Sequence, residues 1–591
     1  MKTSPYRRRA FLPEKADLAD LMVLDDLYRR LRAGLRAAPD APALEKWLDD
    51  YGELLAALSQ ERERRYIAHS LQKDDVDLQS AYDHFAEVVA PWCEPRDVEL
   101  ERLLEAHPAF AALPDYYEAY RRSIRADTAL FRPANLRRLV EEEHLRNEYD
   151  VLYSGLSAPF EGRERTAPEI EAFLENPDRA RREKAWRTAQ ALFAGQAETL
   201  HALYSRQVAL RHQIAREADF DDYRGYFFAA MGRAYGPEDC LRLHGAVERQ
   251  VVPLLRRLNE ARRRALGVET LRPWDLAADP FSRPPLRPFR TVAELLDKTE
   301  ASFAALHPQL GAQFRKLRDL ELLDLETRAE KAPGGYSADL AEARLPYSFA
   351  NVGGSHYDVV VLQHEAGHAF HTLACREQRL YDYRANIPLE FCEVASAAME
   401  HLGAAQYGRF YGEADARRAA RQLLEDALAS LPAIAAVDAF QHWAYAHPDA
   451  APAERDAQWG ALCARFNPGV DWSGLESFRD ASWHQISHFF DAPLYYIEYA
   501  VARLGALQVW SRARREPEAA IDDLLAALEL GGSVPLPGLF ETAGLRLSFG
   551  EEALAPLVAE AAAELDRLAD APAEAAGNPA ALSHPCLPQA A

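Results

Sequence analysis

The chain has 591 residues, a length that indicates several lobes or one large helical body. Apolar residues make up 48% and charged residues 27% of the sequence, as is typical of a folded globular protein. Its formal charge of −23 argues against binding to nucleic acid or to anionic membrane surfaces. Neither a signal-peptide pattern nor an apolar run of about 18 residues is found, so we expect a cytoplasmic protein without a membrane span.

The first part of the chain is predicted to form a helical N-terminal lobe. Apolar side chains recur at helical spacing across residues 17–130, as in Leu44, Leu48 and Tyr51. A loop is expected at residues 155–166, where glycines and a proline interrupt this pattern.

Helices are predicted to resume over residues 167–215, whereas five prolines make residues 271–290 largely non-helical. We therefore expect an N-terminal lobe at 1–190 and a larger second domain at 191–570. Residues 571–591 are rich in alanine and proline without an amphipathic pattern, which predicts a flexible tail.

Six cysteines are scattered along the chain without the short spacings of a disulfide or metal-binding framework. This distribution is typical of reduced thiols in a cytosolic protein, and we interpret them as packing residues. They are Cys93, Cys240, Cys375, Cys392, Cys463 and Cys586.

A small β-sheet is expected just before the central motif. Residues 333–336 are predicted to form a turn and residues 345–352 a strand. Residues 348–352 are a candidate edge strand that would pair with an extended peptide through its backbone.

The central motif is H-E-x-x-H at residues 364–368, whose meaning depends on a helical setting. Ser355 and Asp358 form a capping-box pattern, which predicts a helix over residues 356–376. Residues four apart share a helix face, so His364 and His368 can bind one cation. Glu365 lies to one side, where its carboxylate can accept a proton from an attacking water.

A catalytic zinc usually takes a third protein ligand and keeps one open position. A second helix is predicted over residues 389–402, opened by Pro388, with Glu390, Glu393 and Glu400 along one stripe. Spacing alone does not decide whether Glu390 or Glu393 is the third ligand. Zinc suits these ligand types best, although cobalt and manganese also bind such sites.

Several segments together resemble the thimet oligopeptidase family, and specifically its oligoendopeptidase F branch. The motif helix is one of them. The others are L-R-P-W-D at 271–275, K-A-P-G-G-Y at 331–336, E-V-A-S at 393–396, G-G-S at 531–533 and A-G at 543–544. The likeness runs through most of the chain.

This resemblance implies that Glu393 is the third ligand and that each chain holds one Zn²⁺. In the matching C-terminal segment, 483–499, it implies that His488, Tyr499 and Tyr496 steady the oxyanion and hold substrate. The two tyrosines lie three residues apart on a helix that Pro493 is expected to open. Of the two, Tyr499 is favoured as the oxyanion donor. The implied fold is mainly α, a two-lobed zincin-like metallopeptidase with a deep central channel and a small β-sheet near the active site.

The expected function is that of a zinc-dependent endopeptidase acting on short, unstructured peptides. The alternatives are a carboxypeptidase or dipeptidyl carboxypeptidase with the same zinc site, and a catalytically silent peptide-binding protein. Glu400 is as consistent with a hydrogen-bond acceptor for a ligand imidazole as with an ordinary surface carboxylate. His356 and His371 lie near the motif, and we assign neither a catalytic role.

Overall fold

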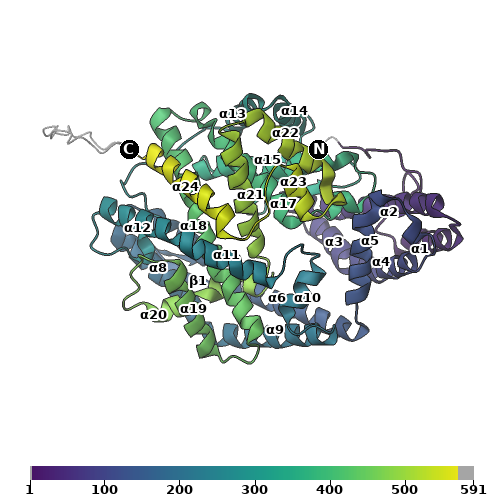
Figure 1. Cartoon of the computed structure of the whole chain (residues 1–591), viewed down its shortest axis with the longest axis horizontal. Coiled ribbons are helices and arrows are strands. Elements are labelled where there is room, and N and C mark those ends of the chain that lie inside the picture. The colour runs from purple at the N-terminus through teal and green to yellow at the C-terminus, as the bar shows by residue number, and fades with distance from the viewer. Residues whose placement is uncertain (1–2, 570–591) are drawn as a thin grey trace.

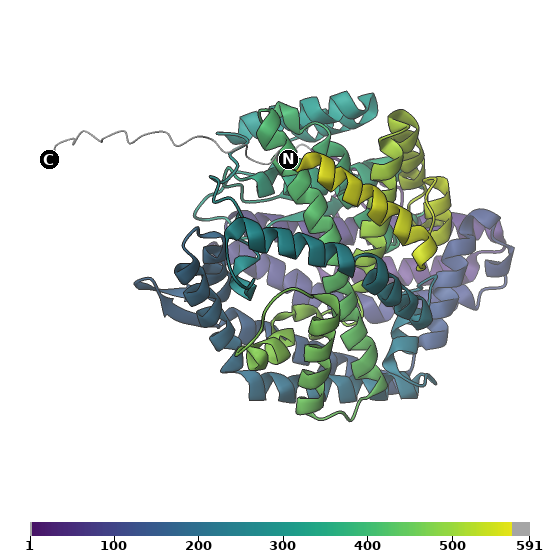
Figure 2. The ribbon, with the colours of Figure 1, turned by 60° about the vertical axis from the view of Figure 1, so that its left-hand side comes forward.

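The computed structural model describes residues 3–569, and its body is built almost entirely from helices (Figures 1 and 2). The predicted mainly α fold class is confirmed. The expected flexible tail, 571–591, lies outside the described residues. Within residues 3–569, no helix combines the length and the apolar composition that a bilayer crossing requires.

The helices before residue 290 are α1 (Leu21–Ala37), α2 (Ala41–Leu71), α3 (Val76–His84), α4 (Ala90–Glu105), α5 (Glu118–Leu130), α6 (Leu136–Ser154), α7 (Ala167–Glu171), α8 (Arg179–Ala194), α9 (Ala197–Glu217), α10 (Tyr223–Ala230), α11 (Pro237–Gln250) and α12 (Val252–Leu266). Those after residue 290 are α13 (Val292–Leu306), α14 (Pro308–Asp319), α15 (His356–Ala374), α16 (Asp382–Ala385), α17 (Leu389–Ala404), α18 (Glu413–Ala446), α19 (Pro452–Phe466), α20 (Glu476–Ala481), α21 (Ile497–Ala513), α22 (Pro517–Leu530), α23 (Leu536–Thr542) and α24 (Glu551–Leu568). The strands are β1 (Ser157–Phe160), β2 (Arg163–Thr166), β3 (Leu323–Asp324), β4 (Tyr336–Leu340) and β5 (Leu345–Phe349).

Helices α1–α5 gather at one end of the molecule, on the right in Figure 1. α1, α2, α4 and α5 share a hydrophobic core of their own, which residues far along the chain, Leu380 and Tyr383, complete. The Tyr383 hydroxyl donates to the Tyr116 carbonyl at 2.6 Å. The N-terminal helices are therefore anchored to the segment that follows α15. The division of the chain at residue 190 stays a prediction.

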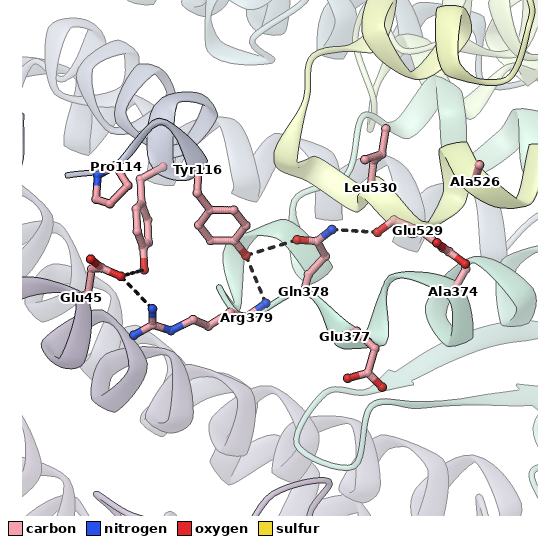
Figure 3. A pocket seen from close by; sticks show the side chains of 11 residues that line it. Glu45, Pro114, Tyr116, Ala374, Glu377, Gln378, Arg379, Ala526, Glu529 and Leu530 are labelled. Atoms are coloured by element: carbon pink, nitrogen blue, oxygen red, sulfur yellow. Dashed lines mark hydrogen bonds and ion pairs between the residues drawn. The ribbon is translucent and has the colours of Figure 1, made fainter. Parts of the chain in front are cut away.

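A cavity of about 660 Å³ lies at this junction (Figure 3). On its wall, the Tyr116 hydroxyl accepts from the Arg379 backbone N–H at 3.1 Å, and Arg379 pairs with Glu45 at 2.8 Å. Ala374, six residues beyond His368, also lines it, which places this wall about 9 Å along α15 from the end of the motif, and no residue of the motif lines the cavity. It is therefore separate from the candidate metal centre.

The loop expected at residues 155–166 is instead a hairpin of β1 and β2. Glu161 and Gly162 connect the strands with φ values of 50° and 83°, as a two-residue hairpin turn requires. The strands were missed because each has only four residues and just one buried side chain, Phe160, falls within them. As predicted, residues 271–290 contain only a short 3₁₀ turn at Pro273–Asp275.

The predicted small sheet is present, with strand order β3-β5-β4. The prediction that 348–352 is an edge strand was wrong, because β5 pairs with β4 on one side and with β3 on the other. β3 has only two residues, too few to be recognised from the sequence. The predicted turn also extends too far, since Tyr336 already belongs to β4.

Helix α15 begins where the capping box predicted. The Ser355 hydroxyl accepts from the Asp358 N–H at 3.3 Å, and the Asp358 carboxylate accepts from the Ser355 N–H at 2.7 Å. α15 ends at Ala374, two residues earlier than expected. α17 packs against both α15 and α21, so these three helices form one packed layer around the motif.

The helix that carries Tyr499 begins later than predicted. Pro493 was expected to open it, but α21 starts at Ile497 because Leu494 adopts a left-handed backbone with φ of 58°. The Leu494 N–H donates to the Gln441 side chain on α18, which holds this turn in place. Tyr496 is consequently the residue before α21, and only Tyr499 lies within the helix.

Candidate metal centre

His364 and His368 lie one turn apart on the same face of α15, as their spacing predicted. Their Nε2 atoms are 3.2 Å apart. Gly367 lies between them on the side of α15 that meets α17, and a Cβ atom there would come within 2.5 Å of the Ser396 Cα. Only glycine allows the two helices to approach this closely.

This close approach brings Glu393 from α17 to the two imidazoles. Its Oε2 lies 3.5 Å from His364 Nε2, and its Oε1 lies 3.9 Å from His368 Nε2. Donor atoms about 2.1 Å from a tetrahedral zinc ion lie roughly 3.4 Å from one another, so two imidazoles and a carboxylate at these distances fit such an ion. The three side chains are 28%, 23% and 20% exposed, which leaves their donor atoms accessible to a small solute.

Glu390 lies on α17 as well but is not part of this cluster. It is buried, and its Oε1 accepts from the Tyr235 hydroxyl at 2.7 Å. Arg233 lies 4.0 Å from the same oxygen. Of the two glutamates that spacing left open, only Glu393 joins the histidines.

Glu400 contacts one of the motif imidazoles. Its Oε1 lies 2.7 Å from His364 Nδ1, and its other oxygen accepts from Arg503 on α21 at 3.3 Å. A proton on His364 Nδ1 then donates to this carboxylate, which leaves the Nε2 lone pair facing the cluster. Of the two roles considered for Glu400, the structure matches that of a hydrogen-bond acceptor.

Sequence reasoning missed two groups that position the cluster. The Ser396 hydroxyl donates to Glu393 Oε2 at 3.0 Å, and Arg503 holds Glu400. Ser396 follows Glu393 by three residues on one helix, so their spacing could have predicted that the two side chains meet. Arg503 lies on a different helix, and nothing in its local sequence marked it.

Burial shapes the protonation of the cluster. Burial and the neighbouring His364 lower the pKa of His368 to about 4, which keeps its imidazole neutral and able to bind a cation. Burial acts to lower the pKa of His364, but the hydrogen bond with Glu400 and the negative charges of Glu400, Glu393 and Glu365 together outweigh burial and raise that pKa. Burial raises the pKa of Glu365, and the charge of Glu393 adds to the shift. A carboxylate made more basic in this way is suited to accepting a proton.

His488, Tyr496 and Tyr499 lie together beside α17. The ring of Tyr496 meets the ring of His488 edge to face at 4.9 Å, and the Tyr499 hydroxyl lies 3.4 Å from His488 Nε2. Burial raises the pKa of Tyr499 to about 12, with Glu393 contributing, and burial lowers the pKa of His488. At neutral pH this gives a protonated phenol and a neutral imidazole, both able to donate a hydrogen bond.

The two remaining histidines near the motif lie apart from the cluster. His356 Nδ1 lies 2.8 Å from the Tyr411 hydroxyl. His371 is 3% exposed, and burial lowers its pKa to about 3. Neither residue belongs to the donor cluster, and their lack of a catalytic role stays a prediction.

Replacing Gly367 with Ala should separate α15 from α17. The added Cβ meets backbone atoms of Ala395 and Ser396 at 2.6 Å or less, so the helices must shift, at a cost of about 1–3 kcal/mol. Urea denaturation followed by circular dichroism would measure this loss. Gly408→Ala is the matched control, because a Cβ at Gly408 meets no atom within 4 Å. Equal stability of the two variants would contradict the packing argument.

Comparison with known proteins identifies a family for this chain. The model of peptidase family M3 matches residues 172–557. An oligoendopeptidase F homolog from Lactococcus lactis is 22% identical over 231 residues, which span 39% of this chain and 37% of that relative.

Two solved structures are similar over nearly the whole chain. The structure of PZ peptidase A with an inhibitor is 29% identical with a TM-score of 0.84, covering 94% of this chain and 98% of that one. A candidate oligoendopeptidase F from Bacillus anthracis is 25% identical with a TM-score of 0.80, covering 94% of this chain and 97% of that one.

Proposed function

Because the chain belongs to peptidase family M3, we propose that it is a zinc-dependent endopeptidase that hydrolyses internal bonds of short, unstructured peptides. The observation that carries this proposal is the convergence of His364, His368 and Glu393 on one point, beside Glu365. In this proposal residues 191–570 form the catalytic domain, and a channel between the lobes admits peptides and excludes folded proteins.

His364, His368 and Glu393 would hold the ion. A bound Zn²⁺ supplies Lewis acidity to the scissile carbonyl and lowers the pKa of the attacking water. Glu365 accepts the proton of that water and passes it to the leaving amine. Glu400 and Arg503 keep the His364 imidazole in the tautomer whose Nε2 is free to bind.

Tyr499 and His488 would act on the carbonyl oxygen of the scissile bond. The carbonyl oxygen gains negative charge as water attacks, and donors already in place stabilise this charge without reorganising. The Tyr499 hydroxyl and the His488 ring share one location next to α17 and are both half-buried. Tyr496 packs on His488 and would orient its ring.

The proposal is tested with peptides of about ten residues, blocked at both termini or unblocked, with and without a chelator. Internal cleavage of the blocked peptides that stops with the chelator and returns with Zn²⁺ is the expected result. Removal of residues from free C-termini alone would indicate an exopeptidase. Binding without cleavage would indicate a silent peptide-binding protein.

Tyr499→Phe should lower kcat for a blocked peptide by about 10²–10³-fold with a smaller change in KM, because it removes an oxyanion donor but keeps the ring. Steady-state kinetics would measure both constants. Tyr496→Phe is the matched control, and we expect it to cost less. If Tyr496→Phe caused the larger loss of kcat, the oxyanion role would pass from Tyr499 to Tyr496.

A further inference from the structure

A second group of side chains of the kinds that bind metals lies between α11 and α18, which pack against each other. Each helix supplies two of them four residues apart: Cys240 and His244 from α11, and Asp438 and His442 from α18. All four residues are at most 2% exposed. The spacing places each pair on one helix face, and the two faces meet.

Several polar atoms in this group have no hydrogen-bond partner. His244 Nε2 lies 2.7 Å from Asp438 Oδ2, but Asp438 Oδ1 is unpartnered. His442 Nε2 lies 3.3 Å from Asp438 Oδ2 without hydrogen-bond geometry, and neither of its ring nitrogens has a partner. A buried polar atom left unpaired costs about 1–3 kcal/mol, so a further binding partner would stabilise this arrangement.

We infer that Cys240, Asp438 and His442 bind a second divalent metal ion, and zinc matches these three donor types best. One donor atom from each residue lies within 4.8 Å of the other two. Thiolate, carboxylate and imidazole are the donors that zinc prefers. One thiolate and one carboxylate balance the two charges of the ion, and a neutral unit suits a fully buried position.

His244 has a positioning role in this site. Its ring holds Asp438 through Oδ2, while Oδ1 has no hydrogen-bond partner and stays free to bind the ion. The site lies next to Gln441, whose side chain holds the turn at Leu494 that precedes Tyr496. An ion joining α11 to α18 would therefore steady the helix that supports the tyrosine segment.

Another group of the same kind, His201, Asp456 and His484, carries no such inference. Both carboxylate oxygens of Asp456 are already engaged. One lies 3.2 Å from His201 Nε2, and the other accepts from Trp483 Nε1 at 2.8 Å.

The test counts metal ions in the full chain after the first centre has been removed. In the His364→Ala/His368→Ala variant, mass spectrometry of metal content should still find about one zinc per chain after gel filtration. Adding Cys240→Ala and His442→Ala should reduce this to near zero. Cys93→Ala, at a buried cysteine in the N-terminal core, is the control and should keep the ion. If the His364→Ala/His368→Ala variant contained no zinc after gel filtration, the inference would be wrong.

Cobalt distinguishes the two centres even if the combined variant does not fold. Only the second centre contains a thiolate, so Co²⁺ bound there should give a thiolate-to-metal charge-transfer band in the near ultraviolet. The band should appear when the His364→Ala/His368→Ala variant is refolded in the presence of Co²⁺. His244→Ala should weaken Co²⁺ binding by about 10–100-fold without removing the band. Absence of the band in the folded parent variant would also refute the site.

Discussion

Replacing Glu365 with Gln should lower kcat for a blocked peptide by about 10²–10⁴-fold, the range that a general base contributes. Glutamine keeps the shape of the side chain but cannot accept the proton of the attacking water. Glu365 is no part of the donor cluster formed by His364, His368 and Glu393, so the bound metal should be retained. Steady-state kinetics and metal analysis of the same preparation would measure both quantities.

Glu413→Gln is the matched control for this experiment, because Glu413 is exposed in the first turn of α18. It should leave kcat and metal content unchanged. Full activity in Glu365→Gln would remove the base assignment. Loss of metal together with activity would instead show that Glu365 helps to hold the ion. The experiment would then not distinguish a metal ligand from a general base.

Local signals predicted the motif helix well. The capping box formed by Ser355 and Asp358, followed by a helical stretch without proline, located the start of α15 to the residue. His364 and His368 then shared a face because helix geometry requires it. These inferences depend only on residues close in sequence, and no contact from another element opposes them here.

Contacts between distant elements were harder to predict. Whether Glu390 or Glu393 met the histidines depended on how α17 is rotated against α15, which no spacing along one helix determines. β5 was taken for an edge strand because its partner β3 is too short to leave a pattern. Pro493 suggested an early start to α21, but the turn at Leu494 is held by Gln441 from another helix.

Two glycines explain why α17 can bring a carboxylate to α15 at all. Gly367 lets α15 approach the backbone of Ser396, and a Cβ at Gly505 of α21 would come within 2.5 Å of the Val394 side chain. α17 is thus held closely from both sides. Its rotation is set by this packing, and the packing turns Glu393 toward the imidazoles.

Glu393→Gln should therefore remove the metal and the activity together. An amide is a much weaker ligand than a carboxylate, and the site would keep only two imidazoles, so we expect zinc affinity to fall by more than about 100-fold. Competition with a chelating dye would measure this affinity, and peptide cleavage would be followed in parallel. The Ser396 hydroxyl can still donate to the amide oxygen, so the fold should be retained.

Glu390→Gln is the decisive comparison, because it makes the same chemical change on the same helix. Its amide oxygen can still accept from the Tyr235 hydroxyl, and its side chain lies outside the donor cluster. It should keep its zinc and most of its activity. Loss of zinc from Glu390→Gln with normal affinity in Glu393→Gln would reverse the assignment, and the arrangement of α15 against α17 would then no longer explain the activity.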